Sequence, residues 1–199
     1  MKLLLCSDLH RDLDATRELV ARSSEADVLV CAGDLAVMRN GLQEVVDVLA
    51  DAACPAVLVP GNGESDGELV EACAEWPEAR VLHGSGCEID GVAFWGLGAA
   101  VPVTPFGSWS FDLPEHEAEA LLADCPEGAV LVTHSPPRGH VDAADGGKHL
   151  GSEAVLQAVE RTMPRLVVCG HVHACWGRES MIGETRVINA GPDGIQVEL

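Results

Sequence analysis

The sequence predicts a single α/β domain over residues 1–199, in which two layers of mixed β-sheet are flanked by helices. Three observations predict this fold class. Short apolar runs alternate with amphipathic stretches of helical period, apolar residues form 47% of the chain, and neither a repeat nor a linker-like segment interrupts it. Strands that alternate with helices favour a parallel sheet with right-handed crossovers.

Three strands and three helices are expected in the first 80 residues. The strands are short apolar runs that end at polar, Gly or Pro residues: 2–6, 27–31 and 56–59. The helices are the amphipathic stretches that follow them: 14–22, 41–53 and 68–76. Asp14 is the expected N-terminal cap of the first helix, because an Asp side chain accepts hydrogen bonds from the free amides of a first turn.

The pattern changes in the second part of the chain. Short strands are expected at 80–83, 87–89 and 92–97, and Asp90-Gly91 between the last two is a strong hairpin signal. A loop rich in Pro and Gly, 98–113, then precedes a helix at 114–124. A strand, a long loop, a helix and a strand follow at 129–133, 135–150, 152–161 and 165–169. The chain is expected to end in two or three antiparallel strands, with a turn at Gly183-Glu184.

The charge of the chain excludes some partners. It carries 12 basic and 32 acidic residues, which give a formal net charge of −20. Binding to duplex nucleic acid or to an anionic membrane surface needs a basic face, so we expect neither partner. Lysine occurs only at Lys2 and Lys148. This composition fits either a salt-adapted cytosol or a genomic bias towards Ala, Gly, Val and Arg, and the sequence leaves both open.

A cytoplasmic location is expected from the cysteines and from the start of the chain. None of the eight cysteines forms a Cys-x-x-Cys pair, and several lie in apolar runs, which is typical of free thiols in a reducing compartment. The apolar run at 2–6 is too short for a signal peptide. No run approaches the ~20 residues of a membrane span.

Five of the predicted strands end in side chains that can bind metal. The segments at their carboxyl ends are Asp8-Leu9-His10, Gly33-Asp34, Gly61-Asn62, Thr133-His134 and Gly170-His171-Val172-His173. In open α/β sheets this edge is where ligands bind, and carboxylate, amide and imidazole donors suit Mn, Fe, Zn or Co better than Ca. A Gly-Asp or Thr-His pair alone is more often a turn or a satisfied polar residue. The prediction of a metal pair therefore rests on the five motifs together.

This order of motifs resembles that of the calcineurin-like metallophosphoesterases, and the resemblance covers nearly the full length of the chain. Segments at 104–113, 133–142, 149–152 and 188–192 resemble a subgroup of small prokaryotic phosphoesterases. The resemblance implies a four-layer α/β/β/α sandwich with two mixed β-sheets. It also implies a dinuclear metal site.

The resemblance assigns the metal ligands residue by residue. One ion would be held by Asp8, His10, Asp34 and His173, and the other by Asp34, Asn62, His134 and His171. Two divalent ions, with Mn²⁺ expected and Fe, Zn, Co or Ni as alternatives, would thus share Asp34. Such a pair lowers the pKa of a bridging water and positions a phosphoryl group for in-line attack. The expected activity is hydrolysis of a small phosphodiester by a metal-bridging hydroxide, with Asp34 and Asn62 among the catalytic residues.

One position departs from the family pattern. The third motif usually reads Gly-Asn-His followed by an acid, and that His is assigned to protonating the leaving group; here Gly63 stands in its place. A missing acid costs most when the leaving group is poor, so we expect diesters with acidic leaving groups to react better than alkyl monoesters. His149 is the expected replacement, with Glu64, Asp66 and His140 as alternatives. For all four, an ordinary solvated loop residue is the competing interpretation.

Other features leave alternatives open. Phe106, Trp109 and Phe111 in the Pro/Gly-rich loop either pack within it, form a hydrophobic wall of the substrate pocket, or contact a second copy of the chain in a homo-oligomer. A catalytically silent scaffold on the same fold is the alternative to an enzyme. We favour the enzyme because all seven ligands are present, and Asp8 and Asp34 without metal would repel each other.

Overall fold

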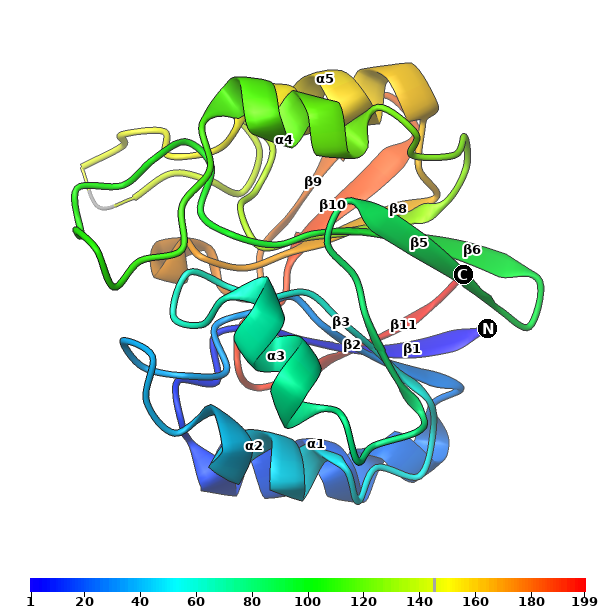
Figure 1. Ribbon diagram of the computed structural model, residues 1–199. Helices are drawn as coiled ribbons and strands as arrows, with labels where there is room; N and C mark the ends of the chain where they lie inside the picture. Colours follow the sequence, from blue (N-terminus) through cyan, green and yellow to red (C-terminus); the bar gives the residue numbers. More distant parts are fainter. Residues whose placement is uncertain (145) are drawn as a thin grey trace.

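The computed structural model describes residues 1–144 and 146–199, and its elements form four layers (Figure 1). Two β-sheets face each other, and helices cover the outer face of each sheet. The order of the layers is α/β/β/α, which confirms the fold class expected from the sequence. In the described ranges, none of the helices combines the length and the apolar character that crossing a membrane requires.

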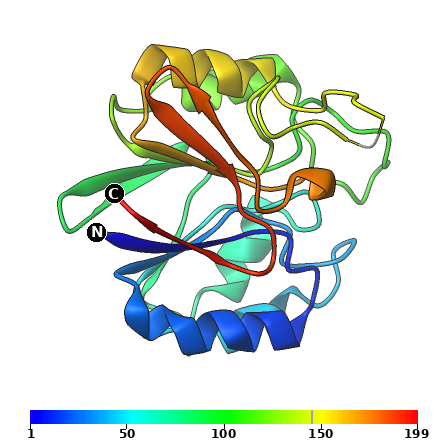
Figure 2. The same ribbon diagram turned by 180° about the vertical axis from the view of Figure 1, so that it is seen from behind.

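The first sheet has the strand order β11-β1-β2-β3-β4. Its strands are β1 (Lys2–Cys6), β2 (Val28–Cys31), β3 (Ala56–Leu58), β4 (Ala79–Val81) and β11 (Ile195–Glu198). Strands β1 to β4 pair in parallel, and β11 pairs antiparallel to β1 with Leu3 opposite Val197. The two ends of the chain therefore lie side by side, as Figure 2 shows.

The second sheet has the strand order β5-β6-β7-β8-β10-β9. Its strands are β5 (Ser85–Ile89), β6 (Val92–Leu97), β7 (Val130–Thr133), β8 (Leu166–Cys169), β9 (Glu179–Ile182) and β10 (Thr185–Asn189). The four central strands are parallel, and hairpins add β5 and β9 antiparallel at the edges. The expected antiparallel end of the chain is only partly right, because β10 runs parallel to β8 and β11 crosses to the other sheet.

Three helices cover the first sheet and two cover the second. They are α1 (Leu13–Arg22), α2 (Leu42–Leu49) and α3 (Asp66–Ala72) on the first, and α4 (Glu115–Leu122) and α5 (Glu153–Thr162) on the second. The cap of α1 is Asp12, not Asp14, because the Asp12 carboxylate accepts hydrogen bonds from the amides of Asp14 and Ala15 at 3.1 and 3.0 Å. A capping box of Ser65 and Glu68 starts α3 two residues earlier than expected.

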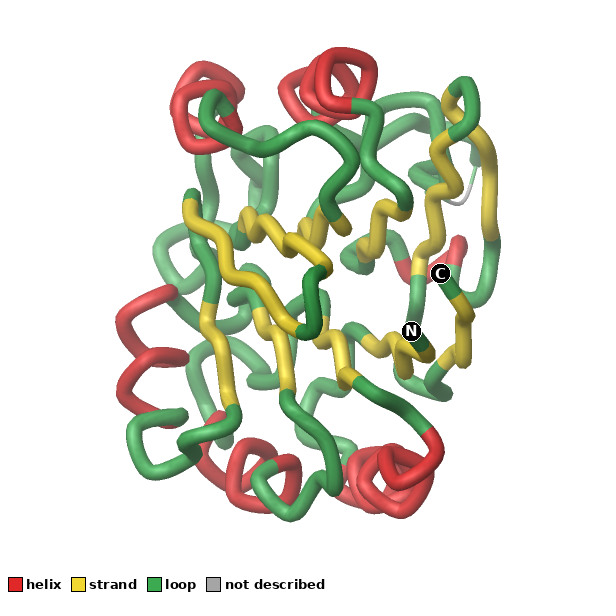
Figure 3. Tube along the Cα trace, turned by 90° about the vertical axis from the view of Figure 1, so that its right-hand side faces the viewer, coloured by secondary structure: helices red, strands yellow, loops and turns green. Residues whose placement is uncertain are grey.

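The apolar residues of the strands serve three cores: one between the two sheets, one between the first sheet and its helices, and one between the second sheet and α4 and α5. Successive strand residues point to opposite faces, so Leu3 and Leu5 enter the core between the two sheets, whereas Leu4 and Cys6 pack on the side of α1, α2 and α3. Figure 3 shows the four layers from the side. Because both faces of β1 and β2 are covered, these strands are apolar apart from Lys2 at the start of β1, and polar side chains return where the strands end.

Candidate metal centre

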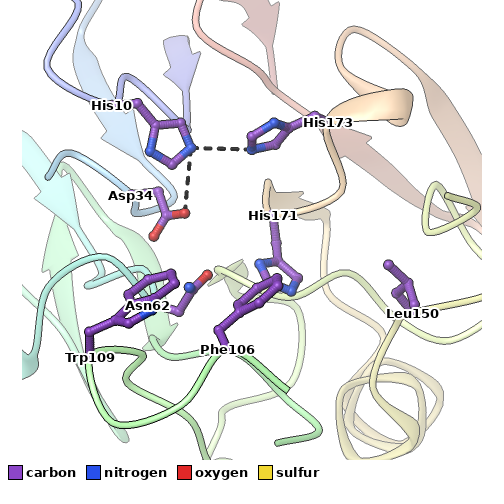
Figure 4. Close-up of a pocket in the computed structure, with 8 residues that line it drawn as sticks. All are labelled: His10, Asp34, Asn62, Phe106, Trp109, Leu150, His171 and His173. Carbon is purple, nitrogen blue, oxygen red and sulfur yellow. Dashed lines mark hydrogen bonds and ion pairs between the residues drawn. The ribbon is translucent and has the colours of Figure 1, made fainter. Parts of the chain in front are cut away.

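Loops at the carboxyl ends of β1, β2, β3, β7 and β8 bring the seven predicted ligands together, and Figure 4 draws five of them. Asp8, His10 and His173 form one group, and Asp34, His134 and His171 form another. Within each group, one ligand atom per residue lies within 4.8 Å of the others. Asn62 joins the second group, because its Oδ1 lies 3.2 Å from Nε2 of His134.

Asp34 lies between the two groups. Its Oδ2 is 3.6 Å from Nε2 of His10 in the first group, and its Oδ1 is 3.5 Å from Nε2 of His134 in the second. In the first group, the Nε2 atoms of His10 and His173 are 3.2 Å apart. A carboxylate with one oxygen toward each group can be shared by two cations. This is the position that the resemblance assigns to Asp34.

Hydrogen bonds to backbone carbonyls orient two of the imidazoles. Nδ1 of His134 lies 2.8 Å from the Ala32 oxygen, and Nδ1 of His10 lies 3.3 Å from the Ala36 oxygen. A carbonyl oxygen only accepts, so each Nδ1 carries the proton and donates. Nε2 of each ring is then the atom directed toward the centre of the site, and once it carries no proton it presents the lone pair that binds a metal ion.

The backbone of the ligand loops is strained. Asp8, His10, Asp34 and His171 all have positive φ angles, of 55°, 45°, 57° and 66°. Side chains other than Gly seldom adopt this region, and such strain is concentrated at functional sites. Hydrogen bonds hold the strained loops: the Asp8 amide donates to the Gly33 oxygen at 2.8 Å, and the His10 amide donates to the Asp34 oxygen at 2.9 Å. The loops after β1 and β2 thus fix each other.

The titration of the buried ligands reflects their neighbours. Burial opposes a charge on His134, yet the adjacent Asp34 carboxylate dominates and raises the pKa of His134 to about 9. Burial and the charge of His134 together lower the pKa of His171 to about 3. The pKa of Asp34 is lowered, because the attraction of His134 and His10 outweighs its burial. Cations bound here would compete with protons for the same nitrogens.

Two residues that the sequence analysis did not single out support the first group. Ser7 Oγ donates to Oδ2 of Asp8 at 2.6 Å, and Nε1 of Trp176 donates to the same oxygen at 3.1 Å. The Trp176 ring also packs against the His173 ring, with centroids 4.4 Å apart. Trp176 therefore touches two members of one group at once.

The second group has its own supports. Nδ2 of Asn62 donates to Oγ of Ser110 at 3.1 Å, and this hydroxyl donates to Asp112 at 2.6 Å. The Pro/Gly-rich loop thereby sets the orientation of the Asn62 amide. Asn189, which is fully buried, donates to the carbonyl oxygens of Gly170 and Val172 at 3.0 and 3.2 Å and so fastens the loop that carries His171 and His173.

The ligands open into a cavity of about 330 Å³. Ligand residues form one part of its lining and apolar side chains the other: His10, Asp34, Asn62, His171 and His173, with Phe106, Trp109 and Leu150. A small phosphate ester fits a cavity of this size.

Comparison with known proteins places the chain in a family. A profile of the calcineurin-like phosphoesterase superfamily domain matches residues 1–197. The chain belongs to this superfamily. It is therefore a phosphoesterase by family, and divalent metal ions are implied. The donor set fits them, because two carboxylates, an amide oxygen and four imidazoles, two of them with their Nε2 atoms directed inward, are ligands for divalent transition metals.

Individual relatives agree with this placement. The UPF0046 protein K07C11.7 of Caenorhabditis elegans is 37% identical over an alignment 211 residues long, gaps included, and the match covers 96% of this chain and 69% of that protein. The human metallophosphoesterase domain-containing protein 1 is 37% identical over an alignment 140 residues long, gaps included; the match covers 67% of this chain but only 39% of the human protein. The crystal structure of TT1561 from Thermus thermophilus has a TM-score of 0.77 at 22% identity, covers 96% of this chain and 90% of that one, and shows the shared fold.

Gly63 occupies the place of the family's His in a turn that has no room for a side chain. Its amide donates to Oδ1 of Asp34 at 2.7 Å. A Cβ atom at this position would lie 2.8 Å from the Ala36 carbonyl oxygen, closer than real Cβ atoms come. Gly63 thus allows close contact between the loops after β2 and β3.

Glu64 does not face the cavity. Its carboxylate is fully buried and accepts hydrogen bonds from the amides of Gly61 and Ala36 at 2.7 and 2.9 Å. Burial, together with the charge of Asp34, raises the pKa of Glu64 to about 7. Glu64 therefore links two ligand loops, and the geometry does not support its role as a proton donor to the substrate.

His149 also lies outside the metal cavity. Its Nδ1 is 2.6 Å from Oδ1 of the buried Asp142, and it lines a separate hollow with Arg178 and Ser180. Its neighbour Leu150 lines the metal cavity instead. Nδ1 of His140 lies 3.3 Å from Oγ of Ser180, and Asp66 is the first residue of α3. The structure thus brings the seven ligands together and leaves the expected proton donors apart from them.

Proposed function

We propose that this protein is a di-metal-dependent phosphodiesterase that hydrolyses a small phosphodiester. The observation that carries the proposal is the pair of ligand groups that share Asp34. When bound, two divalent ions supply a hydroxide nucleophile at neutral pH and offset the charge of the phosphoryl oxygens. We propose Mn²⁺ as the ion, with Asp8, His10 and His173 on one side of Asp34 and Asn62, His134 and His171 on the other.

The chain's own residues set up the reaction. The bonds from His10 and His134 to backbone carbonyls keep their Nε2 atoms directed inward. The contact with Ser110 holds the Asn62 amide at the cavity, where Asn62 is placed to bind both a metal ion and a phosphoryl oxygen. The aromatic rings and Leu150 form the apolar part of the cavity lining.

The preference for diesters rests on the absence of a proton donor. Among the described residues that line the cavity, those that are not predicted ligands are Phe106, Trp109 and Leu150. None of these three side chains can protonate a leaving alkoxide. A leaving group that departs as a stable anion does not need the proton. We therefore propose that aryl or strained cyclic diesters react faster than alkyl monoesters.

A catalytically silent scaffold is the second candidate, and the loss of the His at Gly63 favours it. The ligand set opposes it, because a scaffold has no need for Asp8 and Asp34 to lie buried within reach of four imidazoles. We also propose a cytoplasmic location, which the eight unpaired cysteines support because free thiols persist in a reducing compartment.

Hydrolysis of bis(p-nitrophenyl) phosphate, p-nitrophenyl phosphate and a simple alkyl phosphate, with Mn²⁺ added, tests the proposal. We expect turnover of the diester to exceed that of the alkyl monoester by at least about 100-fold, since general acid catalysis contributes about 10²–10⁴. Asp34→Asn should abolish turnover and reduce the bound metal. Equal turnover of the diester and the alkyl monoester would refute the diester preference. A protein that binds no metal and hydrolyses none of the three is the scaffold.

A further inference from the structure

Two aromatic rings stand beside the metal ligands. Phe106 and Trp109 are stacked with centroids 5.6 Å apart and an angle of 11° between their planes. Both line the cavity that His10, Asp34 and His173 open into, and Figure 4 shows them along one side of it. We call this pair the aromatic wall.

Hydrogen bonds to backbone atoms hold the loop that carries the aromatic wall beside the metal site. Nε of Arg39 donates to the Trp109 oxygen at 2.6 Å, and the Phe111 amide donates to the Asn62 oxygen at 3.0 Å. Within the same loop, the Thr104 amide donates to Asp112 at 2.9 Å. The loop that carries the rings is thus tied to the loop that carries a predicted ligand. The rings have a defined position relative to the phosphoryl site before any substrate arrives.

Phe106 is far more exposed than an aromatic side chain that serves only to stabilise the fold. Phe94 and Trp76 are 1% and 6% exposed, as core aromatics should be, whereas Phe106 is 50% exposed. An exposed ring that is already stacked and anchored still offers a free apolar surface. Such a surface beside a polar site is typical of a pocket for the apolar part of a ligand.

Charge decides which kind of ligand fits the wall. Asp34 is the one carboxylate among the described residues that line the cavity, and it faces the predicted metal ligands. A cationic group on the rings would find no counter-charge in the lining, although ring faces attract cations. Leu150 adds a further apolar side chain. The part of the lining formed by Phe106, Trp109 and Leu150 therefore favours an uncharged group of the substrate.

We propose that the substrate carries a flat, uncharged aromatic ring that stacks on Phe106 and Trp109 while its phosphoryl group lies at the metal ligands. The inference rests on the proposed function for the place of the phosphoryl group. It narrows the substrate class from small phosphodiesters to phosphodiesters with a planar ring. Stacking adds to the contact of apolar surfaces only when both partners are flat, and this property gives the test.

Binding of three small ligands to the Mn²⁺-loaded protein, measured by calorimetry, separates the explanations. Phenylphosphonate and cyclohexylphosphonate are similar in size and apolar character, but only the first is flat; phosphocholine carries a cation. We expect phenylphosphonate to bind about fivefold more tightly than cyclohexylphosphonate. Phe106→Leu and Trp109→Leu keep an apolar side chain and should bring this ratio to about one. Phe111→Leu, in the same loop but outside the cavity lining, should leave it unchanged.

The inference that the aromatic wall binds a flat, uncharged ring would be overturned by equal binding of the two phosphonates by the wild type. Tighter binding of phosphocholine would overturn it as well. If bis(p-nitrophenyl) phosphate is still hydrolysed, the proposed function survives that result. A ratio that persists in both leucine variants would also overturn the inference. So would a dimer that Phe106→Leu converts to a monomer without changing the ratio, because the ring would then belong to an interface. Absence of both hydrolysis and phosphonate binding would overturn the proposed function together with the inference.

Discussion

Trp176 should control the affinity of one metal ion and not of the other. Its indole nitrogen donates to Asp8, and its ring packs on His173, and both belong to the first ligand group. Trp176→Phe keeps a ring that can pack on His173 but removes the donor. The remaining partners of Asp8 Oδ2, Ser7 Oγ at 2.6 Å and the His171 amide at 3.1 Å, stay in place.

The size of the effect follows from the kind of bond. A hydrogen bond to a charged group contributes about 1.5–3 kcal/mol. Trp176 is 37% exposed, so water can replace part of the lost bond and the lower value applies. About 1.5 kcal/mol corresponds to roughly a tenfold weaker Kd. This lies at the low end of the change of about 10–100-fold that residues behind metal ligands usually cause.

Titration of the metal-free protein with Mn²⁺, followed by calorimetry, measures the two sites separately. We expect one Kd to rise about tenfold and the other to stay within twofold of the wild type. Trp95→Phe is the matched control, because Nε1 of Trp95 donates to the Leu121 oxygen at 3.2 Å, outside the metal site. Two sites that weaken equally, or a control that loses as much affinity, would refute the reasoning.

Three further predictions concern the residues around the ligands. Gly63→His should not restore monoesterase activity and should lower the free energy of unfolding by about 1–3 kcal/mol, because a Cβ there meets the Ala36 oxygen at 2.8 Å; rapid hydrolysis of an alkyl monoester by this variant would contradict that. His149→Ala should keep kcat and metal content within twofold of the wild type, since its side chain lines another hollow, and a large loss of kcat at full metal content would restore His149 as a catalytic residue. The raised pKa of Glu64, about 7 against 4.5, means that the folded metal-free protein holds this proton more tightly than the unfolded chain. The contribution of Glu64 to stability should therefore fall by about 3 kcal/mol as pH rises from about 4.5 to about 7. The lowered pKa of His171 acts in the opposite sense in the wild type and in Glu64→Gln alike, so the two proteins are compared: from pH 5 to pH 7 the free energy of unfolding in urea should fall by about 2 kcal/mol more in the wild type than in the variant. Equal changes in the two proteins would contradict the assignment.

The parts of this protein that could be predicted are those that leave a local signal. The buried strands are continuous apolar runs, and each ligand motif begins where such a run stops, so Asp8, Asp34 and His134 stand out in the sequence alone. The start of α3 at Asp66 could also have been predicted from the capping-box spacing of Ser65 and Glu68, although the sequence analysis placed it at residue 68. The choice between Asp12 and Asp14 as the N-terminal cap of α1 could not be predicted, because both residues are Asp and only the backbone geometry distinguishes them.

The residues that the sequence analysis missed act through contacts between distant parts of the chain. Trp176 meets Asp8 across 168 positions, and Ser110 meets Asn62 across 48. No spacing rule links such pairs, because the fold decides which loops adjoin. The hollow that His149 lines could not be predicted for the same reason: its segment resembles a family loop, but the adjacent Leu150 is the residue that lines the metal cavity.

The pairing of β11 with β1 sets an order of events during synthesis of the chain. Asp8 and His10 leave the ribosome early, but the amide of Ser7 bonds to the Gly191 oxygen, and β1 gains its outer partner only when residues 195–198 have emerged. His171 and His173 also come late. Until the segment with His171 and His173 has emerged, a nascent chain therefore carries only part of the metal site. Metal loading is expected to follow the docking of the last strand, and a pause in translation after residue 173 should leave a chain with every ligand and a poorly ordered centre.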